Sequence, residues 1–208
     1  MKLITDIKFL QEENELEDLH FESLSAKGLD MSKRIFESVV FEHCDLAECD
    51  FSGCRFFECS FRHCNLSLAS FAQAYFDHTQ FSDCKLVGIQ WDQMIERKRT
   101  RKRSVFPIAF HACVLSYASF MEMDLFGARF ADCLLHETTF EGADLEGAQF
   151  GQSDCTDAVF RNTRLVKADF STAKHYRIDP TANNIQKAKF SLPEAMSLLY
   201  AMNIEIDN

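Results

Sequence analysis

The chain has 208 residues and a formal net charge of −10 at pH 7, and this length allows one or two domains with a sizeable core. Its N-terminal segment turns acidic before any long apolar run, and no stretch approaches the length of a membrane span. We therefore expect a cytoplasmic protein that has no signal peptide and does not bind a membrane.

A five-residue repeat dominates the sequence, because a Phe or Leu returns at every fifth position along most of it. The series includes Phe36, Phe41, Leu46, Phe51, Phe56 and Phe61, and it resumes through Phe110, Leu115, Phe120, Leu125, Phe130 and Leu135. Neither a helix, with a period of 3.6, nor a strand, with a period of 2, would place these side chains on one face. A second register, two residues earlier, holds small side chains. We predict that these two sites of every five point inward.

A longer period of twenty residues is also present, since Leu46, Leu66 and Leu86 are twenty apart, as are Leu125 and Leu145. Four pentads would therefore complete one turn. If successive turns pair through strand-type hydrogen bonds, equivalent side chains lie about 4.8 Å apart. The sequence predicts an all-β solenoid of square cross-section, in which each turn packs on its neighbours.

In chain order, residues 1–30 keep the repeat incompletely and are predicted to form a lead-in that caps the first turn. A first β-helix module is expected over 31–91, a basic connector or loop over 92–109, and a second module over 110–190. The connector carries six cations, namely Arg97, Lys98, Arg99, Arg101, Lys102 and Arg103. They could form a solvated loop, contact an acidic or DNA-bound partner, or fold back on the acidic walls of the protein.

Residues 191–208 are predicted to form a C-terminal α-helix and tail. Ser191 and Glu194 have the spacing of a capping box, and Pro193 is tolerated in a first turn. An apolar stripe follows at Leu192, Met196, Leu199 and Met202. A helix this short is marginal alone, so we expect it either to cover the open end of the solenoid or to join two copies into a dimer.

Eight of the nine cysteines occupy the small inward register, and Cys155 replaces a central Phe or Leu. A spacing of five residues places successive thiols on different walls of the coil. They would not converge on one zinc ion. We interpret them as structural filler, with Cys44, Cys64 and Cys84 stacked within disulfide reach. His43 and His63 are expected to stack on an outer wall. We predict no metal, no cofactor, no catalytic residue and no small-molecule substrate, and therefore a protein that is not an enzyme.

Binding surfaces are the remaining candidates, and the first is acidic: Glu122, Asp124, Glu141, Asp144 and Glu146. These carboxylates form either a solvated surface or a negative face for a protein that normally holds DNA. Duplex DNA carries a negative charge about every 1.7 Å along its axis, and this charge density is higher than that of the two modules. Mimicry of DNA would therefore depend on the width and length of the rod and on particular acidic faces. Tyr117, Met121 and Phe126 fall at outward sites, where they are either covered by the connector or form an apolar contact patch.

The pentads, in runs such as ADLEGAQF, resemble those of the pentapeptide repeat family, whose fold is a right-handed quadrilateral β-helix. The segments CDLAECDFSGCRFFECSFRHCNLSL, DCKLVGIQW and HYRIDPTANNIQKAKFSLPEAMSLL are most similar to the subgroup that protects type II topoisomerases, which includes the AlbG, McbG and Qnr proteins.

This resemblance implies a homodimer joined through the terminal helix by Leu192, Met196, Leu199 and Met202. It also implies a partial DNA mimic that binds DNA gyrase or topoisomerase IV and protects the enzyme from a poison of the quinolone, albicidin or microcin type. A structural or scaffolding β-helix that binds another protein is the alternative.

Overall fold

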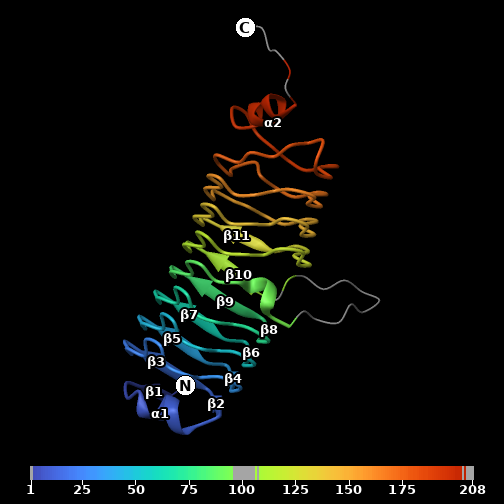
Figure 1. The fold of residues 1–208 in the computed structure, drawn as a ribbon. Coiled ribbons are helices and arrows are strands. Elements are labelled where there is room, and N and C mark those ends of the chain that lie inside the picture. The colour runs from blue at the N-terminus through green and yellow to red at the C-terminus, as the bar shows by residue number, and fades with distance from the viewer. Residues whose placement is uncertain (1, 96–105, 107, 203, 205–208) are drawn as a thin grey trace.

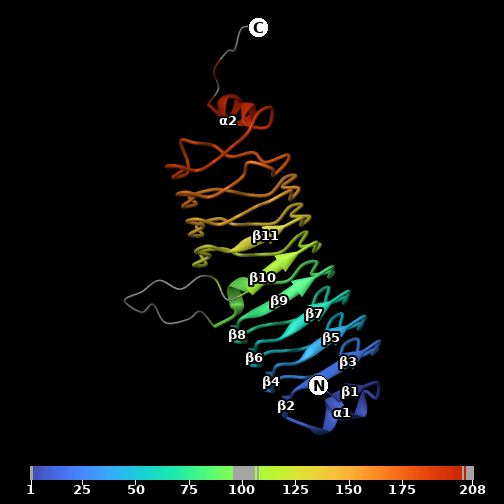
Figure 2. The ribbon, with the colours of Figure 1, turned by 180° about the vertical axis from the view of Figure 1, so that it is seen from behind.

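The chain winds into an elongated solenoid with a short helix near each end (Figure 1). This computed structural model describes residues 2–95, 106, 108–202 and 204. Seen from the opposite side, the turns remain stacked in chain order from the N-terminal to the C-terminal end (Figure 2). Because each turn contacts only its neighbours, the molecule is a rod.

Two parallel sheets form among the described residues. Sheet A contains β1 (Lys2–Ile4), β3 (Leu19–Glu22), β5 (Val40–Glu42), β7 (Ser60–Arg62), β9 (Thr79–Ser82), β10 (Ile108–His111) and β11 (Arg129–Ala131), in that order. Sheet B contains β2 (Glu15–Glu17), β4 (Ile35–Glu37), β6 (Arg55–Phe57) and β8 (Tyr75–Asp77). The helices are α1 (Lys8–Glu12), the 3-10 helix η1 (Trp91–Gln93) and α2 (Met196–Ala201). Beyond β11, single parallel bridges continue the pairing as far as Asp169 and Lys189.

The register of the sheets confirms the twenty-residue turn. Phe36 pairs with Phe56 and Phe56 with Phe76, while Phe41 pairs with Phe61 on the next wall. Backbone hydrogen bonds link these successive turns, as when the N–H of Arg55 donates to the carbonyl of Arg34 (2.8 Å). The predicted all-β solenoid with a C-terminal α-helix is therefore the fold of this protein.

Stacked aromatic rings fill the inside of the rod. The rings of Phe36 and Phe56 have centroids 4.9 Å apart at an interplanar angle of 5°, and those of Phe41 and Phe61 are 4.8 Å apart at 6°. Rings on adjoining walls meet edge to face, as Phe36 and Phe41 do at 5.7 Å. Both arrangements suit the ring quadrupole, and each contributes about 0.5–1.5 kcal/mol beyond the area that it buries. The predicted inward orientation of the central Phe and Leu residues is confirmed.

The small inward register also supplies hydrogen-bond donors, a role that the filler interpretation did not include. The Cys59 thiol donates to the carbonyl of Phe36 (3.4 Å), the Thr138 hydroxyl to Leu115 (2.8 Å) and the Ser153 hydroxyl to Phe130 (2.9 Å). Each acceptor lies 23 residues earlier in the chain. A buried carbonyl of one turn is therefore satisfied by a side chain of the next, which explains why Cys, Ser and Thr share this register.

The two predicted modules share one continuous sheet. Strand β9 pairs directly with β10, so that Phe81 lies opposite Phe110. Trp91 is fully buried and stacks on Phe71 at 5.2 Å and on Phe120 at 6.0 Å, which joins the two halves of the core. The connector is therefore an insertion into a single rod, although the module boundaries themselves remain predictions.

The predicted connector overlaps the coil at both of its ends. Ile95 donates from its N–H to the carbonyl of Ala74 (2.8 Å), and the chain returns at Phe106, whose N–H donates to the carbonyl of Phe126 (2.8 Å). Strand β10 already begins at Ile108. The six predicted cations, from Arg97 to Arg103, lie outside the described residues.

The N-terminal lead-in predicted for residues 1–30 contains part of the coil. Strand β2 pairs with β4, and β3 pairs with β5, so the turns already stack from Glu15. Helix α1 lies before them with Leu10 fully buried in the core, and Phe9 packs near Phe21. Among residues 2–30, it is therefore β1 and α1 that cover the end of the rod.

The C-terminal helix begins later than predicted. Helix α2 starts at Met196 after Ala195, and no side-chain hydrogen bond caps it, so the capping box of Ser191 and Glu194 is wrong. The Glu194 carboxylate instead accepts a hydrogen bond from the N–H of His175 (3.3 Å), which explains why it does not turn back to Ser191. Pro193 consequently precedes the helix.

A substitution in the core should cost far more than one beside it on the surface. We expect Leu145→Ala to lower the free energy of unfolding by about 2–5 kcal/mol, because it removes buried methyl groups and leaves a cavity. The control, Gln149→Ala, changes an exposed residue of the next pentad and should stay within about 0.5 kcal/mol. Urea denaturation measures both, and equal losses would contradict the assignment of inward and outward positions.

The donor role of the small register can be tested with one isosteric exchange at two adjacent sites. Thr138→Val removes a buried hydroxyl that donates to Leu115 and should lower the free energy of unfolding by about 1 kcal/mol. Thr139→Val alters a partly exposed neighbour whose hydroxyl oxygen only accepts a long hydrogen bond from the N–H of Glu141 (3.4 Å). It should cost less than about 0.5 kcal/mol, because water can replace that bond. If thermal and urea unfolding do not distinguish the two variants, the hydroxyl bond contributes nothing.

Candidate functional site: the outer surfaces of the rod

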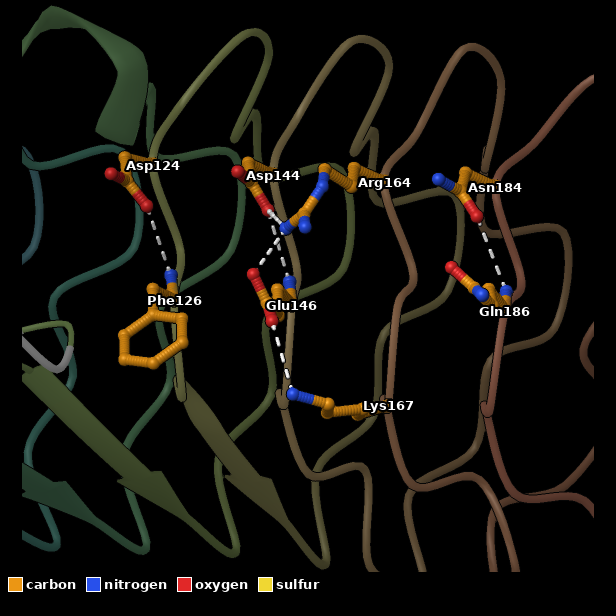
Figure 3. Close-up of polar contacts among 8 residues, drawn as sticks. All are labelled: Asp124, Phe126, Asp144, Glu146, Arg164, Lys167, Asn184 and Gln186. Atoms are coloured by element: carbon orange, nitrogen blue, oxygen red, sulfur yellow. Dashed lines mark hydrogen bonds and ion pairs between the residues drawn. The ribbon is translucent and has the colours of Figure 1, made fainter. Parts of the chain in front are cut away.

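Aspartates of the outer wall stabilise the turns of the coil. Asp124 Oδ1 accepts a hydrogen bond from the N–H of Phe126 (3.2 Å), and Asp144 Oδ1 accepts one from the N–H of Glu146 (3.1 Å) (Figure 3). Asn184 accepts an equivalent bond from Gln186 (3.2 Å). A short side chain that accepts from the backbone two residues later closes a local turn. These positions are therefore structural as well as acidic.

Two cations meet the predicted acidic residues Asp144 and Glu146. Arg164 Nη1 lies 3.2 Å from Asp144 Oδ1 and also hydrogen-bonds Glu146, and Lys167 Nζ lies 3.6 Å from Glu146 Oε1 (Figure 3). The hydrogen bond to Glu146 raises the pKa of Arg164 above its ordinary value. The sequence prediction missed Arg164, although it follows Asp144 by one twenty-residue turn. The negative charge is partly compensated at this point.

Glu122 and Glu141 form a second acidic group, at another corner of the coil. The N–H of Glu122 donates to the carbonyl of Glu141 (2.9 Å), so the two residues belong to successive turns. Glu122 is exposed and leans over Gly142, where an added Cβ would lie 3.1 Å from the Glu122 Cγ. Gly142 also has a φ of +71°, which favours glycine. Within the described residues, neither carboxylate makes an ion pair.

The root of the connector lies next to the first acidic group. Phe106 bonds to the carbonyl of Phe126, and the N–H of Phe126 is the partner of Asp124. The structure therefore brings the C-terminal root of the basic connector to the acidic wall, as two parts of one surface. The placement of the six cations themselves stays a prediction.

The three predicted outward apolar residues do not form one patch. Tyr117 is 58% exposed and continues a corner that contains Leu68 and Gly88, which are linked by the backbone bonds of successive turns. Met121 lies at the next corner and is 40% exposed, and Phe126 is half-buried beside Asp124. A hydrogen bond to Glu137 raises the pKa of Tyr117. The three residues are therefore divided among three successive corners of the coil and form no single apolar contact patch.

The terminal helix leaves apolar side chains in solvent and covers the last turn incompletely. Leu192 is 77%, Leu199 38% and Met202 46% exposed, while Met196 is half-buried. Leu198 faces the core instead. Beneath the helix, Ile185 and Phe190 are only half-buried, in contrast to the fully buried Phe150 and Leu165. The predicted dimer residues thus lie around an incompletely closed end.

Titratable clusters on the surface have structural partners. Asp154 lies 2.9 Å from His175 Nδ1 and 3.4 Å from His136 Nε2, and its Oδ1 accepts the hydroxyl proton of Thr156 at 2.6 Å. Burial raises the pKa of Asp154, but hydrogen bonds from Thr156 and His175 outweigh this effect and bring the pKa below its ordinary value. The Thr156 hydroxyl therefore donates to the Asp154 carboxylate, and these two residues close a turn of the coil.

The part of the chain that the structure describes contains neither a metal-binding cluster nor a membrane-spanning helix. No group of three or more His, Cys, Asp or Glu side chains within it could hold a metal ion. In the same residues, no helix has the length and apolar character needed to cross a bilayer. All nine cysteines are free and buried.

Comparison with solved structures gives the same architecture. Three structures of QnrB1, described as a plasmid-mediated fluoroquinolone resistance protein, superpose on this chain. One trypsin-treated variant has a TM-score of 0.67 at 19% identity and covers 94% of both chains. The full-length form has a TM-score of 0.60 at 20% identity and covers 98% of this chain and 95% of its own. At this identity the likeness shows the shared fold.

Family models match both halves of the rod. The model described as a pentapeptide repeat region matches residues 34–104, and the model described as pentapeptide repeats (8 copies) matches residues 139–174. Together the two segments span just over half of the chain. No curated protein matches the sequence. From its repeat, its coil and these matches, the chain belongs to the pentapeptide repeat family.

Proposed function

We propose that this pentapeptide repeat protein binds a type II topoisomerase, either DNA gyrase or topoisomerase IV, and protects it from a poison of the quinolone, albicidin or microcin type. The observation that supports the proposal is the correspondence with QnrB1, a fluoroquinolone resistance protein, over 94% of both chains. Because the two rods superpose over nearly their full length, this protein would present a surface of similar shape and size to a partner. The role is one of binding and not of catalysis.

The proposed contact surface is the wall that carries Asp124, Asp144 and Glu146, together with the connector rooted beside Phe126 and the corner of Glu122 and Glu141. Arg164 and Lys167 lower the local negative charge. Mimicry of DNA would therefore depend on the outline of the rod and on exposed carboxylates such as Glu122. In the proposal, the connector cations Arg97, Lys98, Arg99, Arg101, Lys102 and Arg103 contact the enzyme.

The proposed active form is a homodimer joined through the C-terminal helix. Leu192, Met196, Leu199 and Met202 supply the contact, and a second copy would cover the half-buried Ile185 and Phe190. Such a contact uses the same surface of each copy around a two-fold axis. The dimer would double the length of the rod, and thereby the length that a DNA-binding groove could follow.

The function can be tested with purified enzymes. In supercoiling assays with gyrase, and in decatenation assays with topoisomerase IV, the protein should raise the half-inhibitory quinolone concentration. A tenfold rise would correspond to about 1.4 kcal/mol of competing interaction. Albicidin and microcin are tested in parallel. If the protein neither rescues nor inhibits either enzyme, the topoisomerase role is wrong and a scaffolding rod is the better explanation.

The connector is tested in the same assay with the six residues Arg97, Lys98, Arg99, Arg101, Lys102 and Arg103 replaced by serine. This variant should lose most of the protection while retaining the unfolding midpoint of the parent. Arg62→Ser, which removes an exposed cation from strand β7, is the control and should protect as the parent does.

Assembly is tested by placing a charge on the terminal helix. Leu199→Glu and Met202→Glu should each convert the dimer to a monomer in light scattering coupled to gel filtration, because an unpaired carboxylate would be buried at the interface. Gln186→Glu adds the same charge at an exposed site of the last turn and should leave a dimer. A dimer that survives both helix variants would place the interface elsewhere.

A further inference from the structure

One wall of the rod carries an apolar stripe on its outer surface. Leu68 is 62%, Tyr117 58% and Leu134 41% exposed, and the half-buried Val87 and Val114 continue the stripe. These residues belong to successive turns, since the N–H of Leu68 donates to the carbonyl of Val87 (2.9 Å) and Val114 pairs with Leu134. We call these five residues the apolar stripe.

Gly88 keeps the stripe continuous between two of its exposed members. It lies one turn after Leu68 and one turn before Tyr117 on the same corner, and its N–H donates to the carbonyl of Ser116 (3.0 Å). A Cβ added to Gly88 would lie 2.8 Å from Leu68 Cδ2. The Leu68 side chain therefore packs over the bare backbone of the glycine, toward Tyr117. A side chain that is already packed in this way loses less freedom when a partner binds.

The apolar stripe lies on the opposite side of the rod from the wall of Asp124 and Asp144. These two aspartates pair across one turn of twenty residues. Leu134 lies halfway between them in the sequence, so its wall is half a turn away from theirs. A partner that covers the wall of Asp124, including the root of the connector at Phe126, therefore leaves the apolar stripe accessible to a second partner.

The wall that bears the stripe is acidic in its C-terminal part. Over three successive turns it is formed by residues 112–117, 132–137 and 152–157, which include no Lys or Arg and contain the carboxylates of Asp132, Glu137, Asp154 and Asp157. Arg177 of the following turn lies 3.7 Å from Asp157 Oδ1. Glu137, which follows Tyr117 on the same corner, meets no cation within the part of the chain that the structure describes. The stripe therefore ends beside uncompensated negative charge.

Apolar side chains next to carboxylates specify the chemistry of an occupant. A contiguous exposed apolar patch marks an interaction surface, and tyrosines such as Tyr117 are frequent anchors of such surfaces. A second copy of this chain would bring the same carboxylates and would be repelled. Turns of the coil are about 4.8 Å apart, close to the 5.4 Å pitch of an α-helix. A helix that lies along the wall would therefore place one apolar side chain on each turn.

We propose that the apolar stripe is a docking site for a basic amphipathic helix of a partner protein. The apolar face of the helix covers Leu68, Tyr117 and Leu134, and its Lys or Arg side chains meet Glu137 and the neighbouring carboxylates. This surface is separate from the proposed topoisomerase contact, so the inference does not depend on that function. The rod would hold two partners on opposite walls.

The test uses the full-length protein and a fluorescein-labelled peptide of leucine and lysine at helical spacing, about 14 residues and therefore about 20 Å long. Fluorescence anisotropy should show saturable binding of one peptide per chain. Leu68→Ser combined with Tyr117→Ser should weaken this binding at least tenfold. The matched control, Ile95→Ser combined with Met121→Ser, removes two exposed apolar side chains from elsewhere on the coil and should bind as the parent does. Both variants should keep the unfolding midpoint of the parent.

The charge part of the proposal is tested separately. Glu137→Gln should weaken the binding of the lysine peptide several-fold, and so should added NaCl, because salt screens interactions between exposed charges. A peptide with glutamate in place of lysine should bind at least tenfold more weakly than the lysine peptide.

Three results would overturn the proposal. Equal peptide affinity in the two double variants would show that the apolar stripe is not the site. Equal affinity for the lysine and glutamate peptides would show that the carboxylates do not select the partner. In the supercoiling assay, the variant with Leu68→Ser and Tyr117→Ser should protect as the parent does, and a loss of protection would show that the stripe belongs to the topoisomerase contact instead of a separate one.

Discussion

In-register stacking of parallel turns is the constraint from which the other properties of this protein follow. Because Phe36 lies on Phe56 and Phe56 on Phe76, every side chain has the environment of the residue one turn away. The interior must then be filled by columns of like residues, and backbone groups must be satisfied by adjacent turns. The connector can be inserted after Ile95 only because the chain returns in register at β10. An insertion of any length is compatible with the coil if it restores this pairing.

The same stacking decides what the surface charge can do. Asp144 and Arg164 face each other because they are one turn apart, and Asp124 accepts a backbone hydrogen bond because a turn follows it. An acidic sequence consequently produces a surface on which several carboxylates already have partners. The exposed corner of Glu122 and Glu141 differs, since stacking places like charges together there. Shape and a few exposed groups are therefore the features that a DNA-binding partner could recognise.

The two ends of the rod are not equivalent. At the N-terminal end, β1 and α1 cover the first turn, and Leu10 is fully buried. At the C-terminal end, α2 contributes Leu198 to the core, but Ile185 and Phe190 stay half-buried and Leu199 is exposed. A solenoid end without a cover exposes apolar and strand surfaces to other chains. In the proposed dimer, it is this less completely covered end that a second copy would bury.

The sequence by itself determined the coil, because the pentad and its twenty-residue period specify which side chains point inward and which ones stack, as Phe41 on Phe61 and His43 on His63 illustrate. It did not determine where local structure ends. The start of α2 was misplaced because Glu194 bonds to His175 from an earlier turn, and the role of Thr138 was missed because its acceptor lies 23 residues away. Tertiary structure alone decided that Arg164 and Lys167 both reach Glu146, since side-chain direction across walls is not encoded in a five-residue period. Repetition fixes the columns, while the contacts between different columns depend on the folded geometry.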